Sequence, residues 1–292
     1  MRALCCLALL LPLATHAASD KPAVIYAIGD IADCNSNAHR ALAELIAADR
    51  ARLPKRSESR LLLLGDLVYP HGTAAEFADC FDPVWGRFRR EILAVPGNHD
   101  YATANGAPFY AYIGPPAAPN GYFSVDLGRW RILGLNSNIA MDKDSAQGRW
   151  LSDTLAGNTR RCTLAMWHHP RFSSGAHGNA AGTQAIWQAL ADARVAVALA
   201  GHDHHYERNT PLDAAGQANP LGTRSFVVGT GGASPYRVRE PAPPITEARR
   251  AGRHGYLRLE LDAAQYRWRF VSLPDGEVLD AGEGHCPPAP AG

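Results

Sequence analysis

Five short polar motifs, each placed directly after an apolar run, constrain the fold of this chain more than any other feature. In chain order they are Gly29-Asp30, Gly65-Asp66-Leu67-Val68-Tyr69, Gly97-Asn98-His99-Asp100, Trp167-His168-His169-Pro170 and Gly201-His202-Asp203-His204. Short apolar runs that end at polar turns are typical of buried strands. Because the ends of neighbouring strands open onto shared loops, we expect the polar side chains to converge on one crevice.

The apolar runs and the segments between them predict an α/β (α+β) fold. Continuous runs predict buried strands at 22–28, 60–64, 92–95, 163–167 and 195–200. Helical spacing of apolar residues predicts helices at 37–49, 75–90, 147–155 and 183–193. A hairpin is expected at 122–135, and alternating strands at 224–228, 256–261 and 266–273. This order fits a four-layer αββα sandwich, two mixed β-sheets flanked by helices, with the motifs at the carboxyl ends of strands.

The first residues resemble a secretory signal peptide, with a buried N-terminal strand or helix as the alternative. A positive charge at Arg2 precedes a short apolar run, and small residues follow at 14–18. The run is shorter than the roughly 20 residues that span a bilayer, so no membrane anchor is expected. Cleavage after Ala17 or Ala18 predicts an exported chain, periplasmic or secreted. We expect a signal peptide at 1–18, a single domain at 19–286 and a flexible Pro- and Ala-rich tail at 287–292.

The composition of the 292-residue chain is that of an ordinary globular protein. Charged residues make up 20% of it and the formal net charge is +1, without a long basic or acidic block. Non-specific nucleic-acid binding therefore has no electrostatic support, no specific nucleic-acid binding is expected, and no protein partner is implied.

Cysteine usage agrees with export. Four cysteines remain once the signal segment is removed: Cys34, Cys80, Cys162 and Cys286. An even number in an exported chain predicts two disulfides, with three possible pairings. We favour Cys34–Cys80, because both follow early strands on the motif side, and Cys162–Cys286, which would tether the C-terminal tail. A zinc site is the alternative, disfavoured because the chain has no C-x-x-C pair.

The residue types in the motifs point to metal binding. Asp, Asn, His and Tyr are hard and borderline ligands that hold pairs of catalytic metal ions. The ordered motifs resemble those of the calcineurin-like metallophosphoesterases, and Tyr69, three residues after Asp66, narrows the resemblance to the purple acid phosphatase branch. The resemblance covers residues 26–206, and the later strands resemble those of bacterial exported members. One departure is Ala32, where the family usually has glycine two residues after Asp30.

The resemblance implies two adjacent metal ions. Asp66 would bridge them, because a carboxylate has two oxygens, and the Tyr69 phenolate would suit Fe(III) and give the purple colour of the family. The second metal would be Fe(II), Zn(II) or Mn(II). His202 and His204 are two residues apart, so on an extended segment they would point the same way. The implied ligands are Asp30, Asp66, Tyr69 and His204 for the first metal, and Asp66, Asn98, His168 and His202 for the second.

Two further histidines resemble the family's substrate-side residues. His99 would act as general acid or phosphate contact, and His177 would bind the phosphate or protonate the leaving group. Together with Asn98 they form the expected substrate-binding set. His169 and His205 adjoin implied ligands, but along a strand they should point the opposite way.

The function that the resemblance implies is that of an exported phosphomonoesterase. It would hydrolyse small phosphorylated substrates by in-line attack of a metal-bound hydroxide. A phosphodiesterase of the same fold, acting on nucleotide or lipid diesters, is the alternative, and pocket shape would decide between the two. A non-catalytic phosphate-binding or metal-binding protein is the third candidate. Against it, every implied ligand is present in the sequence, and so is His99.

Overall fold

The computed structural model describes residues 22–288, except residues 56, 118 and 161. The expected signal peptide at 1–18 and most of the expected tail therefore lie outside the described residues. Within the described part of the chain, no helix has both the length and the apolar character needed to cross a bilayer.

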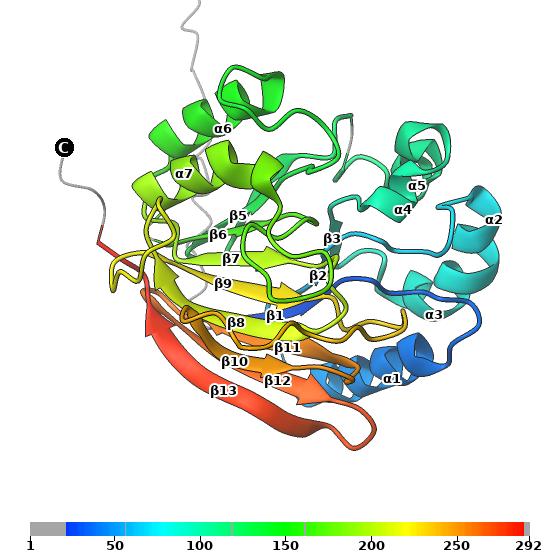
Figure 1. Cartoon of the computed structure of the whole chain (residues 1–292). Coiled ribbons are helices and arrows are strands. Elements are labelled where there is room, and N and C mark those ends of the chain that lie inside the picture. The colour runs from blue at the N-terminus through cyan, green and yellow to red at the C-terminus, as the bar shows by residue number, and fades with distance from the viewer. Residues whose placement is uncertain (1–21, 56, 118, 161, 289–292) are drawn as a thin grey trace, which may run out of the picture.

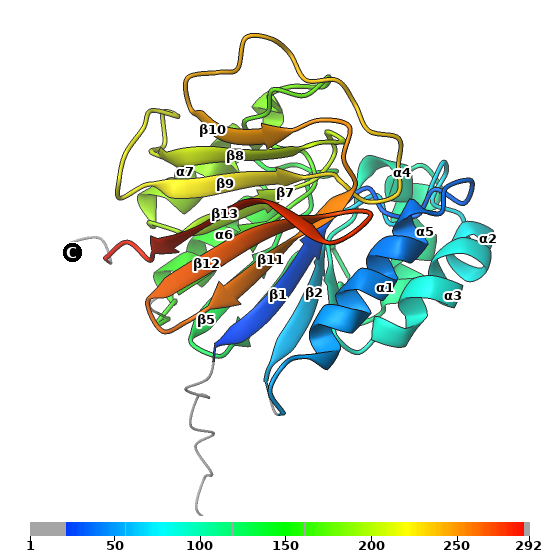
Figure 2. The ribbon, with the colours of Figure 1, turned by 90° about the horizontal axis from the view of Figure 1, so that it is seen from below.

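A six-stranded mixed sheet contains the strands that precede the first three motifs. Its parallel half pairs β1 with β2 and β2 with β3, and its antiparallel half extends from the other edge of β1. The last strands of the chain thus lie beside its first one (Figure 2). In spatial order the strands are β13 (Glu277–His285), β12 (Gln265–Ser272), β11 (Gly255–Leu261), β1 (Ala23–Ile28), β2 (Ser59–Leu63) and β3 (Ile92–Ala94).

A seven-stranded mixed sheet contains the strands that precede the other two motifs. Strands β5, β6, β7 and β9 are parallel, and β4 forms the predicted hairpin with β5. In spatial order the strands are β10 (Thr246–Arg250), β8 (Tyr206–Leu212), β9 (Thr223–Val228), β7 (Val197–Ala200), β6 (Cys162–Met166), β5 (Trp130–Gly134) and β4 (Phe123–Leu127).

Helices cover the outer faces of the two sheets (Figure 1). Helix α1 and the short helices α2 to α5 lie beside β1, β2 and β3, whereas α6 and α7 lie over β5, β6 and β7 (Figures 1 and 2). The α-helices are α1 (Ala38–Ala51), α2 (Ala74–Glu76), α3 (Asp82–Trp85), α4 (Asn98–Tyr101), α5 (Ala107–Ile113), α6 (Ala146–Ala156) and α7 (Gln184–Asp192). Short turns of other helix types are η1 (Phe77–Phe81), η2 (Gly86–Phe88), η3 (Ala104–Gly106) and η4 (Ala181–Thr183).

Three buried clusters correspond to the three interfaces between the layers. Ile25 of β1 and Leu164 of β6 belong to the cluster shared by the two sheets. The next residue, Tyr26, points to the other face, in the cluster that includes Leu42 of α1. Alternate strand residues thus serve opposite faces, as the strand period of two requires. The predicted αββα sandwich is confirmed.

The predicted helical stretch at 75–90 is confirmed as continuous helical backbone from Ala74 to Phe88, but the helix type changes along it. Thr73 caps α2 in a capping box with Glu76, but the chain then passes through the π-helical turn η1, α3 and the 3₁₀ turn η2. Pro83 accounts for the change of helix type, because proline has no N–H for an intrahelical hydrogen bond and its ring clashes with the preceding turn. The apolar spacing alone did not reveal it.

Both favoured disulfides are present. Cys34, in the loop after β1, is joined to Cys80 of η1, and Cys162 of β6 is joined to Cys286, directly after β13. The second disulfide attaches the end of the six-stranded sheet to the seven-stranded one. Its place agrees with the predicted tether of the C-terminal tail.

Candidate metal centre

The five motifs lie at the carboxyl ends of β1, β2, β3, β6 and β7, as predicted. Three of their residues, Asp30, Asp66 and His202, have positive φ angles of 60°, 50° and 72°. Such angles are uncommon outside glycine and are sustained only when the surrounding structure holds them. The chain therefore turns sharply at these residues themselves and aims their side chains into the centre.

Glycines in the motifs serve mainly to let neighbouring segments approach. Gly65 has a φ of 89°, a left-handed conformation that glycine adopts at no steric cost. Gly97, by contrast, has a φ of −99°, yet a Cβ atom there would lie 2.0 Å from Oδ1 of Asp66. The third motif thus packs against the second so closely that only a hydrogen side chain fits.

The donors implied for a first metal lie in mutual contact. The Tyr69 hydroxyl is 2.9 Å from Oδ1 of Asp30, 3.0 Å from Oδ2 of Asp66 and 3.2 Å from Nε2 of His204. Nε2 of His204 is also 3.3 Å from Oδ1 of Asp30. Ligands placed about 2.1 Å from one ion in octahedral geometry are about 3.0 Å apart. These four side chains therefore have the spacing that a shared cation requires.

The donors implied for a second metal adjoin the first group. Nε2 of His168 lies 3.3 Å from Oδ2 of Asp66 and 3.1 Å from Oδ1 of Asn98. The ring of His202 is centred 5.0 Å from the ring of His168. Burial and the neighbouring charges of His168 and His177 lower the pKa of His202 to about 3, so its imidazole is neutral, the form that binds metal.

Asp66 contacts both groups of donors, and it does so with the same oxygen. Its Oδ2 contacts both Tyr69 and His168, whereas its Oδ1 accepts a 2.8 Å hydrogen bond from the backbone N–H of His99. The expected bridging role of Asp66 stays a prediction, and Oδ2 is the oxygen that both groups of donors contact.

Backbone carbonyls orient two of the imidazoles. Nδ1 of His168 lies 2.8 Å from the carbonyl oxygen of Leu64, and Nδ1 of His204 lies 2.8 Å from that of Ser234. Since a carbonyl only accepts, each Nδ1 carries the hydrogen and donates it. Each Nε2 then faces the carboxylates, and a cation that displaced its proton would find the lone pair directed toward the centre, as in metal-binding histidines.

The two buried carboxylates draw positive charge into the centre. Burial lowers the pKa of His168, but the charge and hydrogen bond of Asp66 outweigh it and raise the value to about 9. Burial raises the pKa of Asp66, but the charge of His168 outweighs it, so the value lies well below the usual range. Burial and the charges of Asp30 and Asp66 raise the pKa of Tyr69 well above its ordinary value. A cation would reverse this last shift by replacing the phenol proton.

The structure places both substrate-side histidines, His99 and His177, beside the metal centre. Nδ1 of His99 lies 2.7 Å from the carbonyl oxygen of Pro70, so it donates there and leaves Nε2 available. The His99 ring packs on Tyr69 with centroids 4.4 Å apart. His177 is exposed in the loop before η4, and its ring is centred 4.3 Å from that of His202.

The expected orientation of His169 is wrong. Its ring is centred 4.4 Å from that of His202, and one of its nitrogens lies within 4.8 Å of ring nitrogens of His168 and His202. The segment after β6 is a turn rather than a strand, so adjacent side chains need not alternate. His205 does point away, because it is fully buried and contacts Glu207 at 2.9 Å.

Three functional neighbours were not assigned roles from the sequence. Asp100 is buried and accepts hydrogen bonds from the backbone N–H groups of Leu67 and Gly97, which ties two motifs together. Asp203 is also buried and anchors a loop. Both stand inside the motifs, which was a usable signal. Tyr236 stacks on His204 with centroids 3.9 Å apart, and it lies far from any motif in the sequence.

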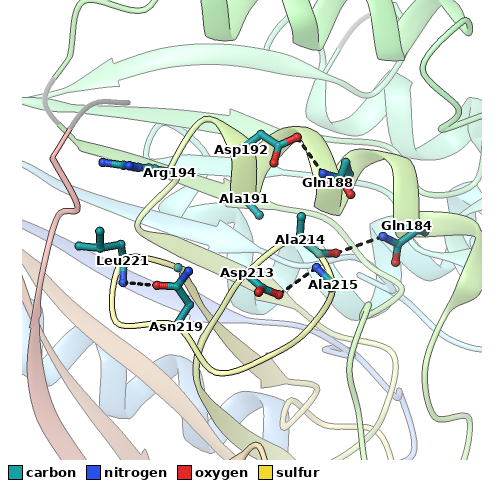
Figure 3. A pocket seen from close by; sticks show the side chains of 11 residues that line it. Gln184, Gln188, Ala191, Asp192, Arg194, Asp213, Ala214, Ala215, Asn219 and Leu221 are labelled. Atoms are coloured by element: carbon teal, nitrogen blue, oxygen red, sulfur yellow. Dashed lines mark hydrogen bonds between the residues drawn. The ribbon is translucent and has the colours of Figure 1, made fainter. Parts of the chain in front are cut away.

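A separate surface pocket of about 710 Å³ lies between α7 and the loop that joins β8 to β9 (Figure 3). Its polar side chains largely satisfy one another. Gln188 donates to Asp192 at 2.8 Å, and Gln184 donates to the carbonyl of Ala214 at 3.3 Å. Its lining residues do not overlap the candidate metal ligands, and the pocket offers no comparable donor set.

The fold and the donor set together define the class of the metallophosphoesterases. Residues 16–206 match the model of the calcineurin-like phosphoesterases, and the chain belongs to that family. Residues 222–281 match a second family, the iron/zinc purple acid phosphatase-like protein C. The predicted resemblance to the purple acid phosphatase branch is confirmed.

Curated relatives and solved structures agree with this assignment. Purple acid phosphatase 21 of Arabidopsis thaliana is 29% identical over 249 residues, which is 75% of this chain and 55% of the relative. Purple acid phosphatase 22 of the same plant is 26% identical over 270 residues, 82% of this chain and 60% of the relative. The purple acid phosphatase PPD1 from yellow lupin (Lupinus luteus) seeds has the same fold, with a TM-score of 0.77 at 17% identity, covering 92% of this chain and 54% of PPD1. The chain thus spans little more than half the length of these relatives.

Proposed function

We propose that the chain is an exported dinuclear-metal phosphoesterase that hydrolyses phosphate monoesters. The observation that carries this proposal is the contact of Tyr69 with Asp30, Asp66 and His204, all within 3.2 Å, and the contact of His168 with the same Asp66 oxygen. Buried oxygen and nitrogen donors at this spacing suit two cations that share Asp66. A phenol between two carboxylates is a sound reason to expect iron in the first position.

The ligands that we propose for the two metal ions are those implied by the sequence motifs. When bound, the two metal ions would clamp the phosphate and lower the pKa of the attacking water. The protein's own groups would then act on the substrate. Asn98 and His177 would hold the phosphate, and Nε2 of His99 would contact it or give a proton to the leaving group. The proposed metal ligands are Asp30, Asp66, Tyr69, Asn98, His168, His202 and His204.

Export is supported by the signal-like N-terminal segment and by the two disulfides. Cys34–Cys80 and Cys162–Cys286 account for all four cysteines that would remain after cleavage. Disulfides persist in oxidising compartments such as the periplasm and the cell exterior.

Metal content, a visible spectrum and ester hydrolysis of the purified mature protein test the proposal together. The expected result is two metals per chain including iron, a broad visible band, and faster turnover of 4-nitrophenyl phosphate than of bis(4-nitrophenyl) phosphate. Tyr69→Phe should remove the band. Tyr112→Phe is the matched control, because its hydroxyl contacts Asp82 in the outer layer, and it should keep the band.

The outcomes separate the parts of the proposal. Two metals with monoester turnover but without the band would contradict iron at Tyr69 and leave a zinc or manganese enzyme. Faster turnover of the diester would overturn the monoesterase assignment in favour of a phosphodiesterase. A protein that binds two metals but hydrolyses neither ester would refute the hydrolase proposal.

A further inference from the structure

Asp203 stands between two proposed ligands, His202 and His204, but its carboxylate binds another segment. Oδ2 accepts a 2.5 Å hydrogen bond from the hydroxyl of Ser173 and a 3.1 Å bond from the backbone N–H of Gly178. Oδ1 accepts a 2.9 Å bond from the backbone N–H of His177. The buried Asp203 carboxylate therefore binds both ends of the loop at 173–178.

The arrangement is specific for an ionised carboxylate. Asp203 is fully buried, and a buried charge is tolerated only where hydrogen bonds replace its hydration. The three donors supply this, and hydrogen bonds to an ionised acceptor are stronger than neutral ones. Gly175 leaves room for the carboxylate, because a Cβ atom there would lie 2.3 Å from Cγ of Asp203. The residue types at 203 and 175 thus both suit this contact.

The loop so held carries an exposed imidazole to the metal centre. The ring of His177 is centred 4.3 Å from that of His202 and 5.4 Å from that of Tyr236. Because the His177 side chain is exposed, the backbone that carries it determines where it lies. Arg239 holds the same loop from outside, through its backbone N–H to Ser174 and its side chain to the carbonyl of Ala176.

We propose that Asp203 is a positioning residue that holds His177 beside His202, so that the imidazole contacts the phosphate of a bound monoester. The proposal rests on the function proposed above. It couples the segment that carries two metal ligands to the loop that carries a phosphate contact.

A double-mutant cycle on inorganic phosphate binding tests the proposal. The variants are Asp203→Asn, His177→Ala and the combination, each loaded with metal and titrated with phosphate by calorimetry. Asparagine keeps the shape but places an NH₂ group against backbone donors, so we expect about tenfold weaker phosphate binding. His177→Ala should weaken binding by a similar factor. If Asp203 acts through His177, the combined variant should bind within about twofold of His177→Ala.

A second variant guards against a folding failure of Asp203→Asn. Gly175→Ala should displace the carboxylate sterically and give the same loss, again only when His177 is present. Gly182→Ala is the matched control, because no described atom beyond its chain neighbours and its own helical turn lies within 4 Å of the added Cβ, and it should bind phosphate normally.

Multiplying losses in the combined variant would overturn the proposal, because Asp203 would then act independently of His177. A fall in metal content for Asp203→Asn would overturn it too, since the residue would then serve the ligands themselves. Failure of the proposed function is distinguishable, because a wild-type protein that hydrolyses no ester still yields a complete phosphate-binding cycle.

Discussion

Gly97→Ala should dismantle the proposed metal centre while leaving the fold intact. The added Cβ would lie 2.0 Å from Oδ1 and 2.3 Å from the backbone nitrogen of Asp66. Real Cβ atoms essentially never approach closer than 3.0 Å, so one of the two segments must shift by about 1 Å. The φ of Gly97 suits alanine, so the overlap is the sole cause.

The size of this shift sets the expected effect. Metal sites require ligand distances within about 0.2 Å of ideal, so a displacement of about 1 Å at Asp66 exceeds the tolerance several-fold. Misplacement by about 1 Å can cost about 10²-fold in rate. Overpacking typically costs about 1–3 kcal/mol, which a domain of this size withstands. We expect less than one metal per chain and at least a hundredfold slower hydrolysis.

The assay combines elemental analysis, 4-nitrophenyl phosphate turnover and urea unfolding on the same preparation. Gly182→Ala is again the control for the added methyl group. A Gly97→Ala protein with two metals and more than half the wild-type turnover would refute the assignment of Asp66 to the centre. A protein that does not fold would instead show that the effect of the overlap is not confined to the metal centre.

The other perturbations have distinct signatures. His99→Ala should keep both metals and slow turnover by about 10²–10⁴-fold, measured by steady-state kinetics; unchanged turnover would make His99 structural. Replacing Cys162 and Cys286 together by alanine opens a link across 124 residues, so the chain-entropy relation predicts a loss of about 5 kcal/mol in the free energy of unfolding, measured in urea. Asp280→Ala should cost about 3 kcal/mol at pH 7, because it removes the bidentate partner of the largely buried Arg208, which keeps only its ion pair with Glu247. Although burial raises the pKa of Asp280, hydrogen bonds from Arg208 lower it below its unfolded value. The Asp280 contribution is therefore full above the unfolded carboxyl pKa of about 3.9 and disappears as pH falls through the lowered value, which urea titrations at several pH values would detect.

Local pattern accounts for most of what was predicted correctly. The apolar runs before Asp30 and Asp66 are buried on both faces, so nearly every residue in them is apolar and the signal is strong. Strands β8, β10 and β13 were missed for the opposite reason. They are rich in polar and charged residues, such as Arg208 and Asp280, whose partners come from distant segments.

The sequence by itself determined the donor set, because residue types and their places after apolar runs are local properties. It also determined the strand ends where those donors lie. Only the tertiary structure decided which atoms face one another. Oδ1 of Asp66 is committed to His99, His169 turns toward His202, and Tyr236 stacks on His204, since each contact depends on turns that join segments remote in the chain. Packing of those turns fixes the geometry of the centre, and no pattern within one segment encodes it.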